Sequence, residues 1–230
     1  MDVPRAGRVR VRYRYGFHLL VQYRYPSMCR PLHRALLLPL FFTLAGCGDS
    51  PTMSELPDDA VILAFGDSLT EGVGARDDES YPALLQQLSG RTVVNAGISG
   101  EISEQGLKRL PGVLDKVQPR LLILCHGGND LLRKHGVPQM EANVRAMISL
   151  AQERGIEVIL LGVPRPGLFL SALEVYGDIA DSMEVLYIDD LVPDVLGDNA
   201  LKSDAVHPNK DGYRVMAEHI HQVLEQSGAI

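Results

Sequence analysis

Residues 61–69 read Val-Ile-Leu-Ala-Phe-Gly-Asp-Ser-Leu, an apolar run that ends abruptly in a glycine, an aspartate and a serine. A short run of Val, Ile, Leu and Phe without alternating polar residues is typical of a strand buried on both faces. The Gly-Asp pair predicts a sharp exit from that strand. In an open parallel sheet, ligands bind just beyond the carboxyl ends of the strands, so Ser68 is the first candidate for chemistry.

Four more apolar runs of this kind follow along the chain. The predicted strands are Val61–Gly66, Thr92–Gly97, Leu121–Gly127, Glu157–Val163 and Val185–Asp189. Segments with helical character lie between and after them, at Tyr81–Leu88, Ser103–Val117, Pro138–Arg154, Ser171–Ala180 and Asn209–Gln226. This alternation predicts an α/β protein with three layers, α/β/α, around a five-stranded parallel sheet.

Charge is distributed unevenly along the chain. Residues 1–46 hold eight arginines and one aspartate, which leaves 14 basic and 28 acidic residues, a net charge of −14, for the rest. Such an acidic surface repels phosphate backbones, so a nucleic-acid partner is not expected.

The N-terminal region has the features of a targeting segment. From Met28, a basic stretch precedes a nine-residue apolar run, Ala35–Thr43, and then Leu44-Ala45-Gly46-Cys47. The run is too short to span a bilayer, and its ending resembles the lipobox of bacterial lipoproteins. We therefore expect a signal peptide at 28–46, lipidation of Cys47, and a location in the cell envelope facing the periplasm.

The remaining domain boundaries follow from this segment. A signal counted from Met1 is too long, so residues 1–27 are interpreted as a mis-assigned start, a genuine Arg/Tyr-rich extension being the alternative. Residues 47–59 are predicted to be the lipidated cysteine and a Ser/Pro/Asp-rich tether, and residues 60–230 the folded domain. Only Cys125 then remains in that domain, so no disulfide is expected within it.

Polar residues with chemical potential follow several of the predicted strands. Ser68 has the placement of a nucleophile, although a helix-capping role fits it equally well. The amide of Gly100 and the side chain of Asn129 follow the second and third strands, where each is a candidate donor to an oxyanion. Each motif alone is also compatible with an ordinary turn, and their coincidence at strand ends favours a site.

The candidate base lies near the C-terminal end, in Asp204-Ala205-Val206-His207-Pro208. A spacing of three residues within one turn at the start of the last helix predicts that Asp204 accepts from His207 Nδ1 and leaves Nε2 free. The alternative interpretation is a plain helix entry with Pro208 in its first turn.

Together these motifs resemble the sequence blocks of the GDSL/SGNH hydrolases, specifically the bacterial thioesterase I/lysophospholipase branch, also called arylesterases. The resemblance implies the flavodoxin-like SGNH hydrolase fold, with Ser68 as nucleophile and His207 oriented by Asp204. It also implies an oxyanion hole made by Ser68, Gly100 and Asn129. Two features depart from that branch: His126 at a strand end, and the segment 164–170.

The resemblance implies a serine esterase that hydrolyses carboxylic ester or thioester bonds through an acyl-enzyme, without a cofactor or metal. We expect a small-molecule or lipid ester as substrate, a monomer, and an acyl pocket lined by Leu168, Phe169 and Leu170, for which core packing is the alternative. The rival functions are a carbohydrate O-deacetylase on the same fold and a non-catalytic lipid-tethered binding protein. The lack of tryptophan argues against the first, and the complete set of candidate residues argues against the second.

Overall fold

A computed structural model of the chain describes residues 52–165, 167 and 171–230. Its centre is a parallel sheet of five strands, β1 (Val61–Gly66), β2 (Thr92–Gly97), β3 (Leu121–Cys125), β4 (Glu157–Leu161) and β5 (Leu186–Ile188), in the order β2-β1-β3-β4-β5. This is the flavodoxin-like order, so the predicted fold class is confirmed. The connection after β1 runs to β2 and the connection after β3 runs the opposite way, to β4, so the topological switch point lies between the ends of β1 and β3.

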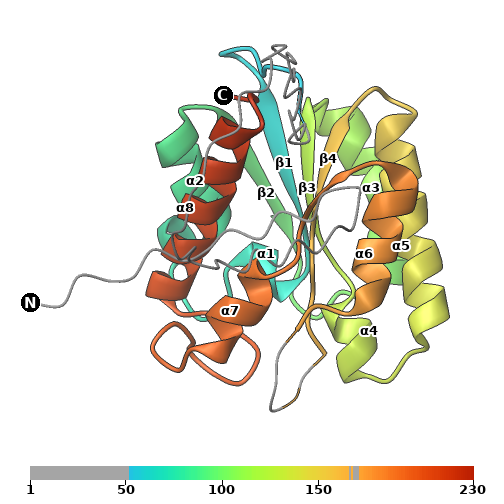
Figure 1. Cartoon of the computed structure of the whole chain (residues 1–230), viewed down its shortest axis with the longest axis vertical. Coiled ribbons are helices and arrows are strands. Elements are labelled where there is room, and N and C mark those ends of the chain that lie inside the picture. Colours follow the sequence, from blue (N-terminus) through green and yellow to red (C-terminus); the bar gives the residue numbers. More distant parts are fainter. Residues whose placement is uncertain (1–51, 166, 168–170) are drawn as a thin grey trace, which may run out of the picture.

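Helices cover both faces of the sheet (Figure 1). One layer is built mainly by α2 (Tyr81–Ser89) and α8 (Lys210–Gln226), which pack against each other, with α7 (Leu191–Gly197) beside α8. The other layer holds α3 (Ser103–Val117), α5 (Val137–Gln152) and α6 (Glu174–Met183). Short helices α1 (Ser68–Glu71) and α4 (Gly128–Leu132) follow β1 and β3, and η1 (Asp77–Glu79) precedes α2.

The register of the strands brings their exits to one level. Gly66 at the end of β1 pairs with Gly97 on one side and with Cys125 on the other. All five residues of β3 are fully buried, as expected for a central strand covered on both faces. The loops after β1, β2 and β3 therefore leave the sheet side by side, and the residues they carry are held by a rigid core.

Several predicted boundaries differ from the observed ones. The helix expected from Ser171 begins at Glu174, because Ala172 instead forms an antiparallel bridge with Pro164. The predicted strands after the second are longer than β3, β4 and β5, and one of the extra residues, Val163, lines the pocket described below. Within the described residues, none of the helices combines the length and the apolar character needed to cross a bilayer.

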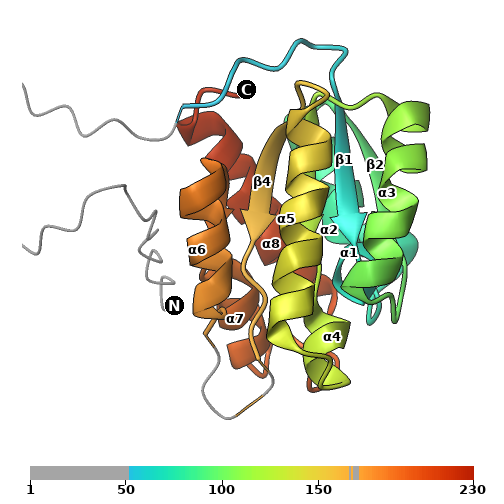
Figure 2. The ribbon, with the colours of Figure 1, turned by 90° about the vertical axis from the view of Figure 1, so that its right-hand side faces the viewer.

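The second half of the predicted tether is part of the folded domain. The amides of Met53 and Leu56 donate to the carbonyls of Ser227 and Ala229, at 2.9 and 2.8 Å. Leu56 is buried, so residues 53–57 do not form a free linker as expected. Figure 2 shows this segment passing over the end of the sheet at which β1 begins, opposite the end at which β1 leads into α1.

Candidate active site

Ser68 is the first residue of α1, at the turn that leaves β1. The N-cap of this helix is Asp67, whose Oδ1 accepts a hydrogen bond from the Leu69 amide at 3.2 Å. Ser68 is therefore not the capping residue, and its half-buried side chain is free to face the pocket at the sheet edge. The capping role considered from the sequence belongs to its neighbour.

His207 lies within hydrogen-bond reach of Ser68 although 139 residues separate them in sequence. His207 Nε2 is 3.1 Å from Ser68 Oγ, and His207 Nδ1 is 2.7 Å from Asp204 Oδ2. An ionised carboxylate only accepts hydrogen bonds, so Nδ1 carries the imidazole proton and Nε2 is left as an acceptor for the serine hydroxyl. The three residues form one hydrogen-bonded chain across the edge of the sheet.

Asp204 and His207 face each other for a different reason from the one predicted. They belong to a loop, and α8 begins only at Lys210 with Asn209 as its N-cap. Asp204 Oδ1 accepts the amides of Val206 and His207, at 2.8 and 2.9 Å, so the aspartate folds the loop around itself. The same carboxylate thus shapes the loop with one oxygen and orients the imidazole with the other.

Electrostatics keep this carboxylate ionised. Its partial burial opposes ionisation, but the hydrogen bonds from the His207 side chain and the Val206 amide lower the pKa of Asp204 below its ordinary value. A negative charge beside Nδ1 stabilises the imidazolium that forms when His207 takes a proton.

Two backbone amides at the exits of β1 and β2 have no acceptor within the described ranges and are candidates for binding an anion. In the described part of the chain, no protein group accepts a hydrogen bond from the amide of Ser68 or from that of Gly100. Gly100 has φ +77°, a left-handed conformation that favours glycine. The loop that carries it leaves β2, where Gly97 pairs with the last residue of β1.

The side chain of Asn129, on α4, is not free in this structure. Its Nδ2 donates to Asp67 Oδ2 at 3.2 Å and to the Glu101 carbonyl at 3.1 Å. Both distances lie at the upper end of the usual range for N–H···O bonds, and an incoming oxyanion, as the stronger acceptor, is able to compete for one proton. Burial raises the pKa of Asp67, and the hydrogen bonds that its carboxylate accepts from the Leu69 amide and the Asn129 side chain oppose that rise.

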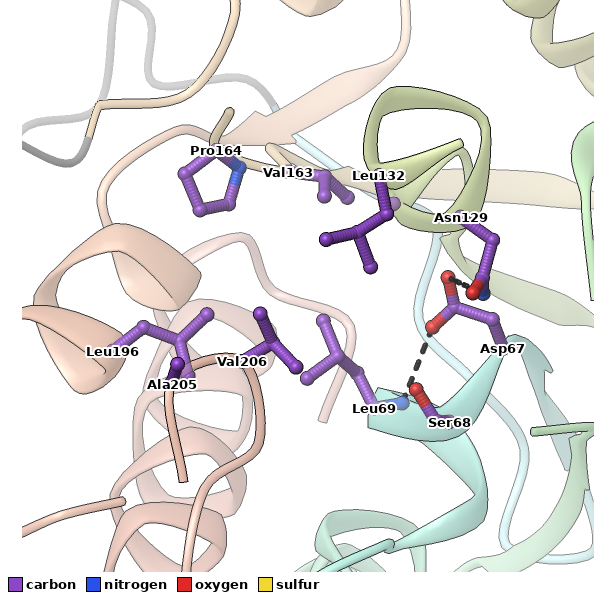
Figure 3. A pocket seen from close by; sticks show the side chains of 11 residues that line it. Asp67, Ser68, Leu69, Asn129, Leu132, Val163, Pro164, Leu196, Ala205 and Val206 are labelled. Atoms are coloured by element: carbon purple, nitrogen blue, oxygen red, sulfur yellow. Dashed lines mark hydrogen bonds between the residues drawn. The ribbon is translucent and has the colours of Figure 1, made fainter. Parts of the chain in front are cut away.

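A pocket opens next to these polar groups (Figure 3), with about 460 Å³ of empty space, its open mouth included. Ser68, Asp67 and Asn129 lie together on one side in Figure 3. The rest of the lining is mainly apolar and comes from several separate segments: Leu69, Leu132, Val163, Pro164, Leu196, Ala205 and Val206. Sequence reasoning missed these residues, because no local pattern distinguishes a pocket leucine from a core leucine.

The predicted acyl-pocket residues and the predicted lipidation site are not among the residues that the structure describes. Leu168, Phe169 and Leu170 lie outside the described residues, as does Cys47, so both predictions stand as expectations. Val163 and Pro164, which precede the predicted acyl-pocket residues along the chain, do line the pocket. Among the described residues, no group of His, Cys, Asp and Glu side chains is arranged to hold a metal ion.

A serine, a histidine and an aspartate linked by hydrogen bonds at the carboxyl edge of a parallel sheet, beside unpaired backbone amides, define a serine hydrolase. A model of the GDSL-like Lipase/Acylhydrolase family matches residues 64–215 of the chain. The chain belongs to this family and is a hydrolase of ester bonds.

Named relatives agree with that assignment. The chain is 32% identical over 174 residues to Thioesterase 1/protease 1/lysophospholipase L1 of Escherichia coli strain K12, covering 71% of this chain and 83% of that protein. It is 30% identical over 202 residues to an arylesterase of Vibrio mimicus, covering 83% and 97%. The crystal structure of TesA superimposes with a TM-score of 0.66 and 29% identity, covering 73% of this chain and 99% of that one.

Proposed function

We propose that Ser68 is the nucleophile of this esterase, that His207 is its general base and that Asp204 orients His207. The observation that carries the proposal is the 3.1 Å contact between His207 Nε2 and Ser68 Oγ, with Nδ1 fixed by the carboxylate at 2.7 Å. These distances lie in the range required for direct proton transfer between nucleophile and base.

The reaction proceeds in two acyl transfers. Ser68 Oγ attacks the substrate carbonyl while its proton moves to His207 Nε2, and the new O–C bond gives a tetrahedral oxyanion. His207 then passes that proton to the leaving alcohol or thiol as the C–O or C–S bond breaks, which leaves an acyl-serine. Water attacks this ester with the same histidine as base, releasing the acid and restoring Ser68.

The oxyanion is held by the amides of Ser68 and Gly100 together with Asn129 Nδ2. Both amides lack an acceptor among the described residues and are therefore available to a ligand, and the Ser68 amide is one of the free N–H groups at the start of α1, where anions bind favourably. Asn129 contributes by exchanging one of its long hydrogen bonds, to Asp67 or to the Glu101 carbonyl, for the stronger bond to the developing negative charge.

The pocket supports an acyl group as the part of the substrate that is recognised. Its apolar lining, which includes Leu132, Val163 and Val206, has no aromatic ring among the described residues on which a sugar could stack. We therefore propose carboxylic esters or thioesters with an aliphatic acyl chain as substrates, in preference to acetylated carbohydrates. The relatives named as thioesterase, lysophospholipase and arylesterase fit this class.

The test of this function compares wild type with Ser68→Ala on p-nitrophenyl esters, acyl-thioesters, lysophospholipids and acetylated sugars. Ser99→Ala is the matched control, because Ser99 follows the neighbouring strand and its hydroxyl makes no hydrogen bond in the described part of the chain. Turnover of aliphatic esters that is abolished only in Ser68→Ala supports the proposal. Wild-type turnover by Ser68→Ala contradicts it, and turnover of acetylated sugars alone shifts the assignment to an O-deacetylase.

We further propose that Cys47 is lipidated and holds the enzyme in a bacterial cell envelope, facing the periplasm as a monomer. Residues 53–57 pack along the edge opposite Ser68, so the catalytic end points away from an anchor placed at residue 47. At most about 3.3–3.6 Å per residue, the five residues between Cys47 and Met53 reach roughly 20 Å. Intact-mass analysis of the mature protein tests this: an unlipidated N-terminus upstream of Cys47 contradicts it.

A further inference from the structure

A buried charged cluster lies directly behind the proposed oxyanion hole, and the proposed mechanism does not use it. Glu101, which follows Gly100, is only 6% exposed and is gripped by Arg109 of α3 through two hydrogen bonds, at 2.9 and 2.6 Å. His126, at the exit of β3 and fully buried, contacts the same carboxylate with Nε2 at 3.2 Å. The amide of Gly127 donates to His126 Nδ1 at 3.0 Å, which assigns the proton to Nε2 and makes it a donor to Glu101.

This cluster ties the Gly100 loop to the rigid part of the fold. Arg109 also donates to the carbonyl of Ala96 in β2 at 3.0 Å, and its guanidinium stacks 4.1 Å from the ring centroid of Phe65 in β1. Arg109 of α3 thus links the Glu101 carboxylate to β1 and β2, and His126 links it to the exit of β3. Gly106 of α3 leaves the space for this arrangement, because a Cβ there would clash with His126 Nε2.

Glu101 also touches the other side of the oxyanion hole. Its main-chain carbonyl accepts one proton of Asn129 Nδ2 at 3.1 Å, and its own amide donates to the Ile98 carbonyl, closing the turn that presents Gly100. One residue thus fixes the backbone next to the Gly100 amide and the orientation of the Asn129 amide. The remaining contacts of the turn, from Arg133 to the Gly100 carbonyl and from the Ser99 amide to Glu71, steady it from the solvent side.

Burying a carboxylate in this way is costly in free energy. Burial opposes ionisation of Glu101, and the hydrogen bonds from His126 and Arg109 overcome it and lower its pKa to about 2. An apolar residue of the same size is often as stabilising as a buried ion pair, so a contribution to stability alone does not account for this cluster.

Resting on the proposed function, we propose that Glu101, clamped by Arg109 and His126, is a positioning residue that sets the relative placement of the two oxyanion donors, the Gly100 amide and Asn129 Nδ2. It touches neither substrate nor nucleophile. Its effect is exerted on the transition state, where the negative charge appears, and not on substrate binding.

The experiment is a double-mutant cycle between Glu101→Gln and Asn129→Ala, read as kcat and KM on a p-nitrophenyl ester. The glutamine side chain keeps the shape of Glu101 but sets an amide donor against His126 Nε2–H or Arg109. We expect kcat to fall about 10- to 100-fold with KM nearly unchanged, because small misplacements of reacting groups cost this much. On the Asn129→Ala background, the same change has a smaller effect, since one of the two donors that Glu101 positions is already absent and only the Gly100 amide remains to be misplaced.

Two further variants keep the test decisive. Arg109→Lys retains the positive charge at a partly exposed position but loses the bidentate hydrogen bonding to Glu101. We expect it to lower kcat with KM nearly unchanged, which provides a test even where Glu101→Gln folds poorly. Glu141→Gln is the control, because Glu141 also forms a Glu–Arg ion pair, with Arg145 on α5 at 2.8 Å, although this pair is more exposed than that of Glu101. We expect Glu141→Gln to leave kcat unchanged. Circular dichroism and thermal unfolding establish that each variant is folded.

The outcomes separate the two proposals. If the fold-decrease in kcat of the double variant equals the product of the two single fold-decreases, the cluster is only structural and the positioning role is wrong. The oxyanion assignment of Asn129 then still stands. If Asn129→Ala alone retains the wild-type kcat, that assignment fails and the positioning role fails with it. A change confined to KM also contradicts the positioning role.

Discussion

Replacement of Asp204 by asparagine tests how much of catalysis depends on the orientation of His207. The new amide side chain in Asp204→Asn keeps an oxygen for the backbone amides of Val206 and His207, so the loop retains its shape. At the other position, an NH₂ group replaces the oxygen that lies 2.7 Å from His207 Nδ1. Two donors then face each other, which favours the tautomer with the proton on Nε2, where it cannot accept the Ser68 proton.

The magnitude follows from two contributions. The interaction of the carboxylate with the imidazolium at a charge separation of about 4 Å is worth about 4 kcal/mol at an effective dielectric constant of 20 and about 1 kcal/mol in water. The Asp204 side chain is 54% exposed, so about 2–3 kcal/mol applies. The imidazole still reacts when its proton is on Nδ1, but Nδ1–H then faces the asparagine NH₂ group. The missing hydrogen bond costs about 1–3 kcal/mol. Together, about 4 kcal/mol corresponds to a kcat lower by about 10³-fold.

The assay is initial-rate hydrolysis of a short-chain p-nitrophenyl ester at saturating substrate, with thermal unfolding of each variant as a check on the fold. Asp198→Asn is the matched control, because Asp198 Oδ1 also accepts a backbone amide, that of Ala200 at 2.8 Å, near the same loop. We expect wild-type kcat for this control. A kcat for Asp204→Asn within threefold of the wild type refutes the proposed role of the carboxylate.

Three further results are expected. The pKa of Glu101 lies at about 2 in the folded protein against an ordinary 4.5, so its ionisation stabilises the fold above pH 4.5 and this contribution, at most about 3 kcal/mol, disappears as pH falls toward 2. In urea unfolding, the gap between wild type and Glu101→Gln therefore narrows from pH 6 to pH 3, and a constant gap contradicts this. Gly97→Ala sets a Cβ against the Glu71 amide nitrogen, well inside van der Waals contact, and must displace α1 with the nucleophile, lowering kcat about 10²-fold. Gly112→Ala, with open space around its Cβ, leaves kcat unchanged and stabilises α3 by up to about 1 kcal/mol; equal kcat values for the two glycine variants argue against the steric reasoning. Leu132→Ala enlarges the pocket and lowers kcat/KM for octanoyl esters about 10-fold more than for acetyl esters, and an unchanged chain-length profile excludes it as an acyl contact.

The sheet and most of its helices were predictable because their signals are local and strong. Continuous apolar runs mark the strands, and Val61–Gly66, Thr92–Gly97 and Ser103–Val117 were predicted with the bounds that the structure has. The short helix α4 was not predicted, and α1 was expected only as a helix start next to Ser68, since four or five residues do not contain a full hydrophobic period. Helix α1 follows the exit of β1 and is capped by the Asp67 side chain, whereas α4 follows the exit of β3 with Gly127 as an N-cap that has no side chain.

The site was predictable to the extent that topology gathers strand exits. Ser68 and His207 were paired from their motifs, and the structure brings their side chains within 3.1 Å. The reason given for the Asp204 placement was wrong, because an aspartate that accepts two amides folds a loop as effectively as a helix turn does. The Glu101 cluster gave no sequence signal beyond an unusual His126, since its members lie on different elements and meet only in the folded protein.

The most direct test of the central claim, that His207 activates Ser68, is the rate and position of reaction with a fluorophosphonate probe. Peptide mapping by mass spectrometry of the labelled protein is expected to locate the phosphonate on Ser68, and His207→Gln is expected to slow labelling by at least about 10³-fold while the protein stays folded. An adduct on another residue, or labelling of Ser68 at the same rate without the imidazole, contradicts the account.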